Sequence, residues 1–519
     1  KNLYADIYRL CAITSYMNAD VAMMEKCVRE YLALMSGDAR ATLEGYRVLV
    51  EGYIVNNRLD DAVEQIRYVL DKLNYQISAK SNPLRSALSV MAMLLGNTTD
   101  LNVEAFRHLG KRPESFDVGI FLIHLANVTY AKNDISLAAY AISVAIRFCL
   151  RNGLAEEASY VLQFWACCVM GGFFHNLEKA RESSDLTFQM ESEIRRGAYS
   201  VRSRFVRNAF LGYHLDGLEE NIRQLNEDFY NNFYEGDLPV ASYAAHVCCF
   251  HAFDYNIPLH DLLRRIDVYA DQLRCYPVQN PDAWIKVLRQ IVVNLLNVES
   301  IGVDGEDFSF SRDLQAVRVR NNPALVLIAH HYCLAFYALT GNFEIADHVR
   351  ETDRHVRHVM GTYGVLLSAT MNAYVVFQRA QRGLCSMAEA QSYLKRAIKS
   401  LKRSYLQGSK VCYGKLQLLE ALAAQLNGKE HWKSSLNASL QFSRENGNLM
   451  DALLALIVSM QFSLSGERMA LRDQALELCR AWNAPRIARY IVQMSEDLAG
   501  TKSRVIDASA ISVAAPMMH

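Results

Sequence analysis

Hydrophobic residues recur at helical spacing along most of the chain. Within residues 46–73, Tyr46, Leu49, Val50 and Tyr53 lie three and four positions apart, which places them on one face of an α-helix. The polar triplet at 56–58 ends that helix. A second apolar stripe follows at Ala62, Ile66, Val69, Leu70 and Leu73. Each stripe can be buried only against a neighbouring helix, so the segment predicts an antiparallel helix hairpin.

The same unit recurs as a helix, a Gly or Asn break, and a second helix with a small residue near its start. Breaks of this kind follow apolar helices predicted at 324–339, 374–381 and 418–426, and Gly447-Asn448 precedes another at 453–464. A tetratricopeptide unit of about 34 residues has this pattern. Ala62 and Ala346 take its small position, each with a tyrosine nine residues earlier. The repeats drift between about 34 and about 45 residues, so they are degenerate.

These patterns predict an all-α, right-handed superhelical solenoid of antiparallel helix pairs with degenerate tetratricopeptide-like repeats. Turns or loops are expected at 79–83, 110–115, 276–281 and 302–312, where Gly, Pro and polar residues gather. The expected organisation is N-terminal repeats over 1–300, an irregular loop segment over 301–322, C-terminal repeats over 323–499 and a linker or tail over 500–519.

The charge balance argues against some classes of partner, and the cysteine spacing indicates the compartment. Lys plus Arg and Asp plus Glu each total 55, so no basic excess suggests nucleic acid or a membrane surface. The longest apolar run, 324–339, is interrupted by His330 and His331 and is shorter than a membrane span requires. The 12 cysteines contain no C-x-x-C pair, which favours buried reduced thiols in a cytoplasmic protein. With Lys1 at its start and no signal peptide, the chain is expected to be a segment of a larger product.

Several phrases resemble one known family. They are the run YAKNDISLAAYA at 130–141, in which Lys132 and Asp134 replace the usual Gly and Ser, YEGD at 234–237 followed by Ala241 and Tyr243, RQIVVNL at 289–295 followed by GEDF at 305–308, ENG at 445–447 and CRAWNA at 479–484.

Taken together, these phrases resemble the helical-repeat region of large multidomain signalling ATPases, whose ATPase is related to the maltose-operon type of activator. The resemblance covers residues 3–498. It implies a STAND-type AAA ATPase module before this region, often with a protein kinase domain in front, and a GAF domain and a histidine kinase after it. Residues 504–514 would then begin the linker toward the GAF domain.

The chain lacks the motifs of catalysis. It has no phosphate-binding G-x-x-x-x-G-K-[ST] loop, no kinase signatures, no G-x-S-x-G and no H-E-x-x-H. No catalytic, cofactor-binding or metal residue is therefore predicted, and no cofactor. The sharpest metal candidate is a helix carrying Asp347, His348, Glu351, His355 and His358, of which the last three share a face. The alternative is a solvated face on which Arg350, Arg354 and Arg357 pair with the acids.

Other conspicuous side chains are expected to be structural. His330 and His331 cannot aim at one ligand from adjacent helical positions, so one is expected at the groove and the other at a helix crossing. His246 and His251 do not share a face. The aromatic clusters are expected in the core, with a docking role as the alternative; they are Phe229, Tyr230, Phe233 and Tyr234, and Trp165, Phe173 and Phe174. The basic stripe is expected on a solvated face, with docking to an acidic surface as the alternative; it consists of Lys395, Arg396, Lys399, Lys402 and Arg403.

The expected function is that of a non-catalytic regulatory and protein-interaction scaffold within a multidomain signal-transduction ATPase or kinase. Its partners would be proteins or peptides and the neighbouring ATPase and kinase domains of the same polypeptide. The alternative is a free-standing tetratricopeptide-like adaptor that recruits a peptide or partner protein.

Overall fold

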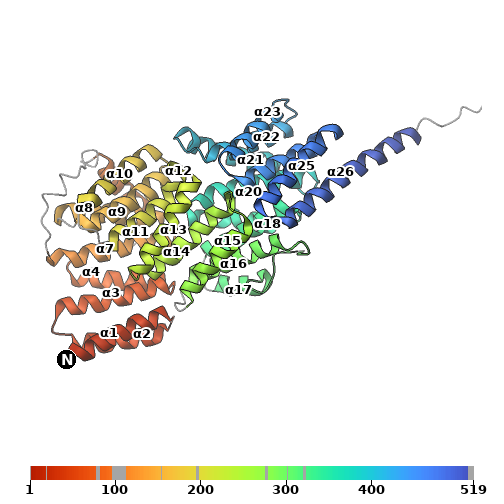
Figure 1. Cartoon of the computed structure of the whole chain (residues 1–519). Coiled ribbons are helices and arrows are strands. Elements are labelled where there is room, and N and C mark those ends of the chain that lie inside the picture. The colour runs from red at the N-terminus through yellow and green to blue at the C-terminus, as the bar shows by residue number, and fades with distance from the viewer. Residues whose placement is uncertain are drawn as a thin grey trace, which may run out of the picture.

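The structure is a computed structural model, and it describes residues 2–18, 20–77, 82–95, 113–152, 155–193, 198–274, 279–300, 302–319 and 323–511. Throughout these residues the secondary structure is helical, without a strand. Successive helices pack as antiparallel neighbours from one end of the molecule to the other (Figure 1). The predicted fold class, a solenoid of helix pairs, is confirmed.

The first part of the chain contains eleven α-helices and two π-helical segments among the described residues. They are α1 (Asn2–Met17), α2 (Val21–Leu34), α3 (Ala39–Val55), α4 (Leu59–Lys72), α5 (Pro83–Leu95), α7 (Pro113–Ala131), α8 (Ile135–Asn152), α9 (Ala155–Phe164), η1 (Trp165–Phe173), α10 (Leu177–Glu193), α11 (Ala198–Arg207), η2 (Asn208–Gly212) and α12 (Tyr213–Leu215).

The second part continues in the same manner and includes one 3₁₀ segment, η3. Its elements are α13 (Leu218–Tyr234), α14 (Leu238–Asp254), α15 (Leu259–Leu273), α16 (Gln279–Leu296), α17 (Phe310–Val319), α18 (Pro323–Thr340), α19 (Ala346–His355), η3 (Val356–Val359), α20 (Tyr363–Gln381), α21 (Met387–Leu406), α22 (Cys412–Leu426), α23 (Trp432–Glu445), α24 (Leu449–Phe462), α25 (Ser465–Trp482) and α26 (Pro485–Ile511).

Local sequence signals set the helix ends. The side chains of Asp20, Asp38 and Ser386 accept hydrogen bonds from backbone N–H groups in the first turns of α2, α3 and α21. The predicted break after α3 turns on Asn57, whose φ of 57° is left-handed, a conformation that Asn tolerates well. The breaks at Gly383, Gly428 and Gly447 also have positive φ. The short turns that separate the helix pairs therefore follow from the sequence.

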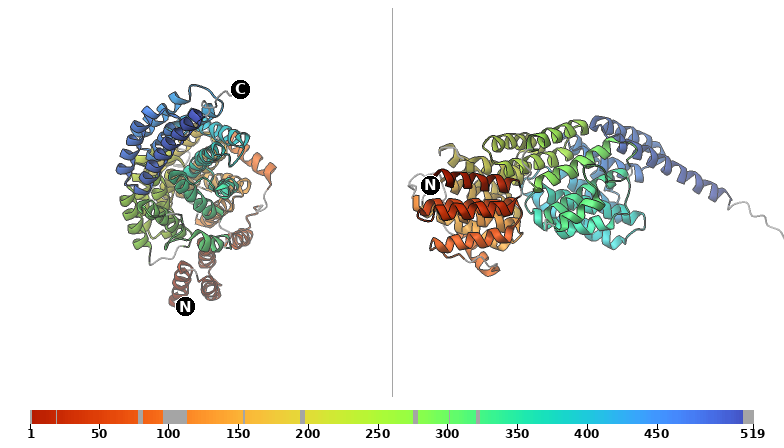
Figure 2. Two further views of the ribbon diagram at one scale, coloured as in Figure 1. Left: turned by 90° about the vertical axis from the view of Figure 1, so that its right-hand side faces the viewer. Right: turned by 90° about the horizontal axis from the view of Figure 1, so that it is seen from below.

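The hydrophobic core divides into two large clusters. One joins residues between Ala12 and Leu211, and the other joins residues between Tyr213 and Met494. The two halves follow each other along the solenoid, and the end-on view shows the helices arranged around a central axis (Figure 2). The inner helices α18, α20 and α24 are buried over most of their surface.

The boundaries differ from the sequence prediction in three places. Within 301–322, predicted as irregular, residues 310–319 form α17, and the described irregular part is 302–309. The helix α26 continues beyond 500 to Ile511, where a linker was expected, and projects from the stack (Figure 1). The helix α16 begins at Gln279, so Pro281 lies in its first turn, a position that needs no N–H donor. Residues 113–115, also predicted as part of a loop, begin α7. The remaining parts of the predicted loops, 79–81, 110–112 and 276–278, lie outside the described residues.

Burial accounts for the cysteines and for the long apolar helix α18. The predicted buried thiols are confirmed at Cys149, Cys167, Cys168, Cys248, Cys249 and Cys333. Contrary to the sequence expectation, α8 and α18 are each long and apolar enough to cross a bilayer by length and composition. In α18, however, 78% of the apolar window is buried inside the stack, against 50% in α8. The apolar surface of α18 is thus used in packing within the protein.

Candidate functional site

The inner helices of the solenoid enclose a cavity of about 560 Å³. Its walls come from both halves of the chain: α3, α7, α9 and α11 on one side, and α14, α16, α18 and α20 on the other. A cavity of this size is typical of small-molecule sites in proteins. Because it lies between the two hydrophobic clusters, its lining depends on how the halves meet.

One end of the cavity is charged. Arg202 on α11 forms an ion pair with Asp237 at the start of α14. Arg47 and Glu51, one turn apart on α3, approach to 3.4 Å, and Glu51 lies 3.8 Å from His124 of α7. Burial raises the pKa of Glu51. Burial, aided by the two arginines, lowers the pKa of His124 to about 3, so the imidazole is neutral at pH 7. The charges at this end are largely compensated within the protein.

Another part of the lining is aromatic. Trp284 of α16 packs with its ring centroid 4.8 Å from that of His246 and 5.4 Å from that of Tyr243, both on α14. His246 stacks in turn on Phe250 at 6.0 Å, one helical turn along. Burial lowers the pKa of His246 to about 3. This part of the lining is therefore uncharged at pH 7, and the Trp284 ring is tilted by 54° and 56° against those of Tyr243 and His246.

Several polar atoms of the cavity-lining residues lack a hydrogen-bond partner. On the aromatic wall they are Nδ1 of His246 and Nε1 of Trp284, both of which are buried atoms. Three other residues of the lining also have a buried polar atom without a hydrogen-bond partner: His124 Nε2, Asn232 Oδ1 and His358 Nδ1. An unpaired buried donor or acceptor costs about 1–3 kcal/mol. These atoms have almost no accessible surface, so they lie behind the cavity lining and are not exposed to the cavity itself.

A buried polar network stands behind the cavity. His251 Nδ1 lies 2.7 Å from Asn221 Oδ1, and Asn221 Nδ2 donates to the backbone oxygen of Asn208 at 2.9 Å. Asn208 Nδ2 donates to Asp228 Oδ2 at 2.8 Å. Burial raises the pKa of Asp228 to about 7, opposed by the hydrogen bond from Asn208. Asn208 begins the π-helical segment η2, so the network also anchors the irregular backbone beside the cavity.

The segment 356–362 borders the cavity and crosses from the second half of the chain to the first. Tyr130 Oη of α7 donates to the backbone oxygen of Met360 at 2.6 Å, and Tyr213 Oη donates to that of Gly361 at 3.0 Å. Gly361 has φ +84°, and a Cβ on Gly172 of η1 would lie 3.3 Å from its Cα. The crossing requires glycine at both positions, because a side chain would meet backbone and Gly361 is left-handed.

A fully buried ion cluster lies next to the cavity. Lys415 Nζ of α22 donates to Asp254 Oδ2 at 2.9 Å and to Asp451 Oδ2 at 2.6 Å. Tyr363 Oη, from the cavity wall, also donates to Asp254. Burial raises the pKa of Asp451 to about 6, while the ammonium of Lys415 acts in the opposite direction. The cluster joins α14, α20, α22 and α24 at one point.

Three residues of the candidate metal site stay close together. Although α19 ends at His355 and His358 lies in η3, the ring centroids of His355 and His358 are 5.7 Å apart, and His355 Nε2 lies 3.7 Å from Glu351 Oε2. Asp347 and Glu351 form ion pairs with Arg350 and Arg354. His348 turns inward, with its Nδ1 3.1 Å from that of His330. Within the described ranges, no group of three or more His, Cys, Asp or Glu side chains is arranged to hold a metal ion.

The two adjacent histidines of α18 point in different directions, as predicted. His330 packs against His348 at a helix crossing, and its ring lies 4.8 Å from that of Phe310. His331 lines the cavity, 3.4 Å from Ser368 Oγ. His246 and His251, expected to be structural, both contribute to the cavity lining.

The other sequence candidates lie away from the cavity. Phe229 is buried in the core, whereas Tyr234 is 79% exposed on the outer helix α13. Trp165 is buried in η1, and Phe173 at its end is 52% exposed. The basic stripe of α21 is a solvated face, in which Arg396 pairs with Asp353 and Arg403 donates to the backbone oxygen of Phe174.

Sequence reasoning missed the ion cluster and the aromatic wall. A signal for the first was present: Lys415 stands three and four residues before Leu418 and Leu419, so it falls on the apolar stripe of α22. Asp451 likewise stands inside an apolar helix. For Trp284 and Tyr243 no local signal existed, because they belong to different helices and meet only in the tertiary fold.

Comparison with known proteins adds little. No family model and no curated protein matches the chain. Among solved structures, the chain is similar to a "circular tandem repeat protein with novel repeat topology and enhanced subunit contact surfaces", with 12% sequence identity over 98% of each chain and a TM-score of 0.16. A score this low supports no argument about this chain, and the assignment as a helical solenoid rests on the helices described above.

Proposed function

We propose that this chain is a non-catalytic, cytoplasmic regulatory and interaction scaffold within a multidomain signalling ATPase. The proposal combines the helical solenoid, a fold generally used for protein interactions, with the resemblance of its sequence phrases to the repeat region of that family. The observation that carries it is an apolar surface on α1.

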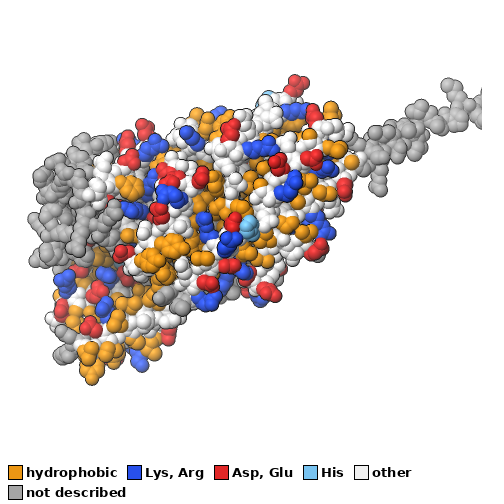
Figure 3. All heavy atoms as spheres, in the orientation of Figure 1, with side chains coloured by type: hydrophobic (Ala, Val, Ile, Leu, Met, Phe, Trp, Pro, Cys, Tyr) orange, Lys and Arg blue, Asp and Glu red, His pale blue; other side chains and the backbone are white. Residues whose placement is uncertain are grey.

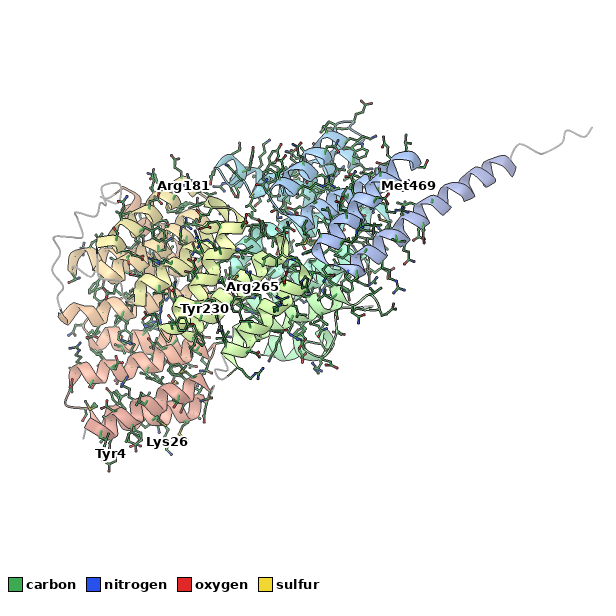
Figure 4. All side chains as sticks on the ribbon, viewed as in Figure 1. Tyr4, Lys26, Arg181, Tyr230, Arg265 and Met469 are labelled. Carbon is green, nitrogen blue, oxygen red and sulfur yellow. The ribbon has the colours of Figure 1, made fainter. Side chains whose placement is uncertain are left out.

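This surface, called the α1 stripe below, consists of Leu3, Tyr4, Ile7 and Leu10. These side chains are 71, 66, 52 and 54% exposed. They lie three and four residues apart, so they form one face of the helix. Figure 3 shows hydrophobic side chains at this end of the molecule, and Figure 4 shows Tyr4 pointing away from the stack.

Exposed apolar patches mark contact surfaces, and the α1 stripe is such a patch. The occupant favoured here is a neighbouring domain of the same polypeptide, since the family that the sequence phrases resemble places its ATPase module before the repeats. In such an arrangement, a partner that binds to the solenoid changes the activity of the ATPase.

The test uses the full polypeptide that contains this segment. Replacing Ile7 and Leu10 together by Asp is expected to uncouple the ATPase from its regulation and to expose the junction to limited proteolysis. Glu64→Lys, on the exposed face of α4, is the matched control and should leave both unchanged. Unaltered regulation in the Asp variant would contradict the proposal.

The reading frame upstream of Lys1 distinguishes the alternative. A start codon directly upstream, with no ATPase module, favours a free-standing adaptor that recruits a partner protein or peptide through the same solenoid.

A further inference from the structure

Two cysteines lie opposite each other in the first helix pair. Cys11 lies six residues before Met17, the last residue of α1, and Cys27 lies six residues after Val21, the first residue of α2. In an antiparallel pair, positions equally far from the turn lie at the same height along the helix axes, because every residue adds the same rise. The two cysteines therefore stand at one level of the α1–α2 pair.

Both side chains also lie on the packed sides of their helices. Cys27 is 4% exposed and belongs to the buried stripe of α2, together with Met24, Val28 and Tyr31. Cys11 is half-buried and packs against the hydrophobic cluster that contains Cys27. Burial raises the pKa of Cys27 to about 11, and a hydrogen bond with the Cys11 thiol adds to this shift. The two thiols are therefore neighbours in the folded protein.

The two thiols differ in their access to solvent. The thiolate, and not the thiol, is the group that attacks a disulfide. Burial disfavours the thiolate of Cys27 and keeps dissolved oxidants away from it, whereas Cys11 retains accessible surface. Cys11 is thus the group that reacts first with a low-molecular-weight disulfide, and Cys27 is the group placed to displace the product.

We propose that Cys11 and Cys27 are a redox site, in which a reversible disulfide fastens α1 to α2. First, the Cys11 thiolate attacks glutathione disulfide, forms a Cys11–glutathione disulfide and releases one glutathione thiolate. Second, the Cys27 thiol loses its proton to solvent, and its thiolate attacks the Cys11 sulfur, forms the Cys11–Cys27 bond and releases the second glutathione. Two protein thiols are thereby oxidised, and one glutathione disulfide is reduced to two glutathione molecules.

The position of the pair in the stack decides what the bond does. The helix α1 packs mainly on α2 and α3 at one end of the described stack, so fewer neighbours hold it than hold an inner helix such as α24 (Figure 1). A bond between Cys11 and Cys27 closes a short loop, which removes conformations from the opened hairpin and not from the packed one. Oxidation should therefore lock the α1–α2 pair, and reduction should allow it to open.

The experiment equilibrates the whole chain with reduced and oxidised glutathione at about pH 8, blocks the remaining thiols and digests the protein with trypsin. Trypsin cleaves after Lys26, so the two cysteines fall in the separate peptides 10–26 and 27–29. The expected result is a saturable yield of these peptides joined by a disulfide, preceded by glutathione on Cys11. In the oxidised protein, hydrogen exchange of α1 and α2 should be about tenfold slower, and that of α24 should not change.

Three variants assign the steps. Cys27→Ala should accumulate the Cys11–glutathione disulfide without any joined peptides. Cys11→Ser should leave Cys27 as a thiol under the same conditions, because glutathione disulfide does not reach it. Cys385→Ser removes the other half-buried cysteine of the described residues, and as the control it should leave the yield of joined peptides unchanged.

The proposal is overturned if the folded wild-type protein gives no joined peptides, whether or not Cys11 takes up glutathione. Joined peptides that form only in urea would also overturn it, as would a Cys27 that takes up glutathione in Cys11→Ser as fast as Cys11 does in the wild type. Faster hydrogen exchange of α1 and α2 after oxidation would show that the bond distorts the pair, which contradicts the lock.

Discussion

Helices of the same solenoid are buried to different extents, as a comparison of α3 in the first half with α24 in the second half shows. In α3 of the first half, 6 of 17 residues are buried, whereas in α24 of the second half 11 of 14 are buried. The helix α24 packs against α14, α22, α23, α25 and α26, so neighbours surround it. The helix α3 packs against α1, α2, α4 and α7, and part of its remaining face borders the cavity.

This difference decides which chemistry each half can contain. Where the inner helices are enclosed, an ammonium and two carboxylates can be held without water around Lys415, because each charge has a fixed partner. Where they are open, the charges of Arg47 and Glu51 stay partly exposed in the lining of the cavity. One repeat pattern thus produces a packed core and a cavity in the same chain.

The largest expected effect comes from Lys415→Met, which removes the cation from between two buried carboxylates. Leaving Asp254 and Asp451 together without it should lower the free energy of unfolding by about 3–5 kcal/mol, measured by urea denaturation. Lys410→Met changes an exposed lysine five residues earlier and should cost less than about 0.5 kcal/mol.

Hydrogen exchange of the Lys415→Met variant tests whether the halves are energetically distinct. Exchange should increase in α14, α22 and α24 and stay unchanged in α2–α4. Equal acceleration throughout would show that the solenoid unfolds as one cooperative unit, and the contrast between halves would not extend to stability.

An intermediate effect is expected at Asp228, at the junction of the halves. Its pKa is raised by burial to about 7, so the native state holds the proton more tightly than the unfolded chain does. Its contribution to stability is therefore fully present below its ordinary pKa and is lost as the pH rises toward 7.

Asp228→Asn should remove this dependence. Between pH 5 and pH 8 the wild-type free energy of unfolding should fall by about 2 kcal/mol more than that of the variant. Denaturation curves at both pH values measure the difference, with exposed Glu227→Gln as the control. Parallel pH profiles for wild type and Asp228→Asn would show that the carboxyl is ionised without penalty.

The smallest effect is expected at the contact that borders the cavity. Tyr130→Phe removes the hydrogen bond to the backbone oxygen of Met360 and leaves the ring in place. The loss should be about 1 kcal/mol by thermal or urea denaturation, with faster exchange in 356–362. Tyr4→Phe, at an exposed position, should be neutral. A neutral Tyr130→Phe would mean that this hydrogen bond does not stabilise the contact between the halves.

Much of the local structure could be predicted because it is encoded over a few residues. The stripe at Tyr46–Tyr53 and the polar break at Asn57 predicted α3 and its end, and the Gly383 turn predicted the start of α21. Less of the candidate site could be predicted from the sequence. His355 and His358 are neighbours as predicted, but the sequence did not predict that the backbone changes to a 3₁₀ segment after His355. The π-helical segments η1 and η2 had no recognised local signal.

By itself, the sequence determined the helix pairs, their turns, the buried thiols and the solvated basic face of α21, since each follows from spacing within one or two turns of helix. Only the tertiary structure decided that Lys415 meets Asp254, 161 residues away, that Trp284 faces His246, and that Tyr130 bonds to a segment 230 residues later. The physical reason is that a helical period specifies which face is buried but not which distant helix covers it. That choice depends on the curvature of the whole stack, to which every pair of helices contributes.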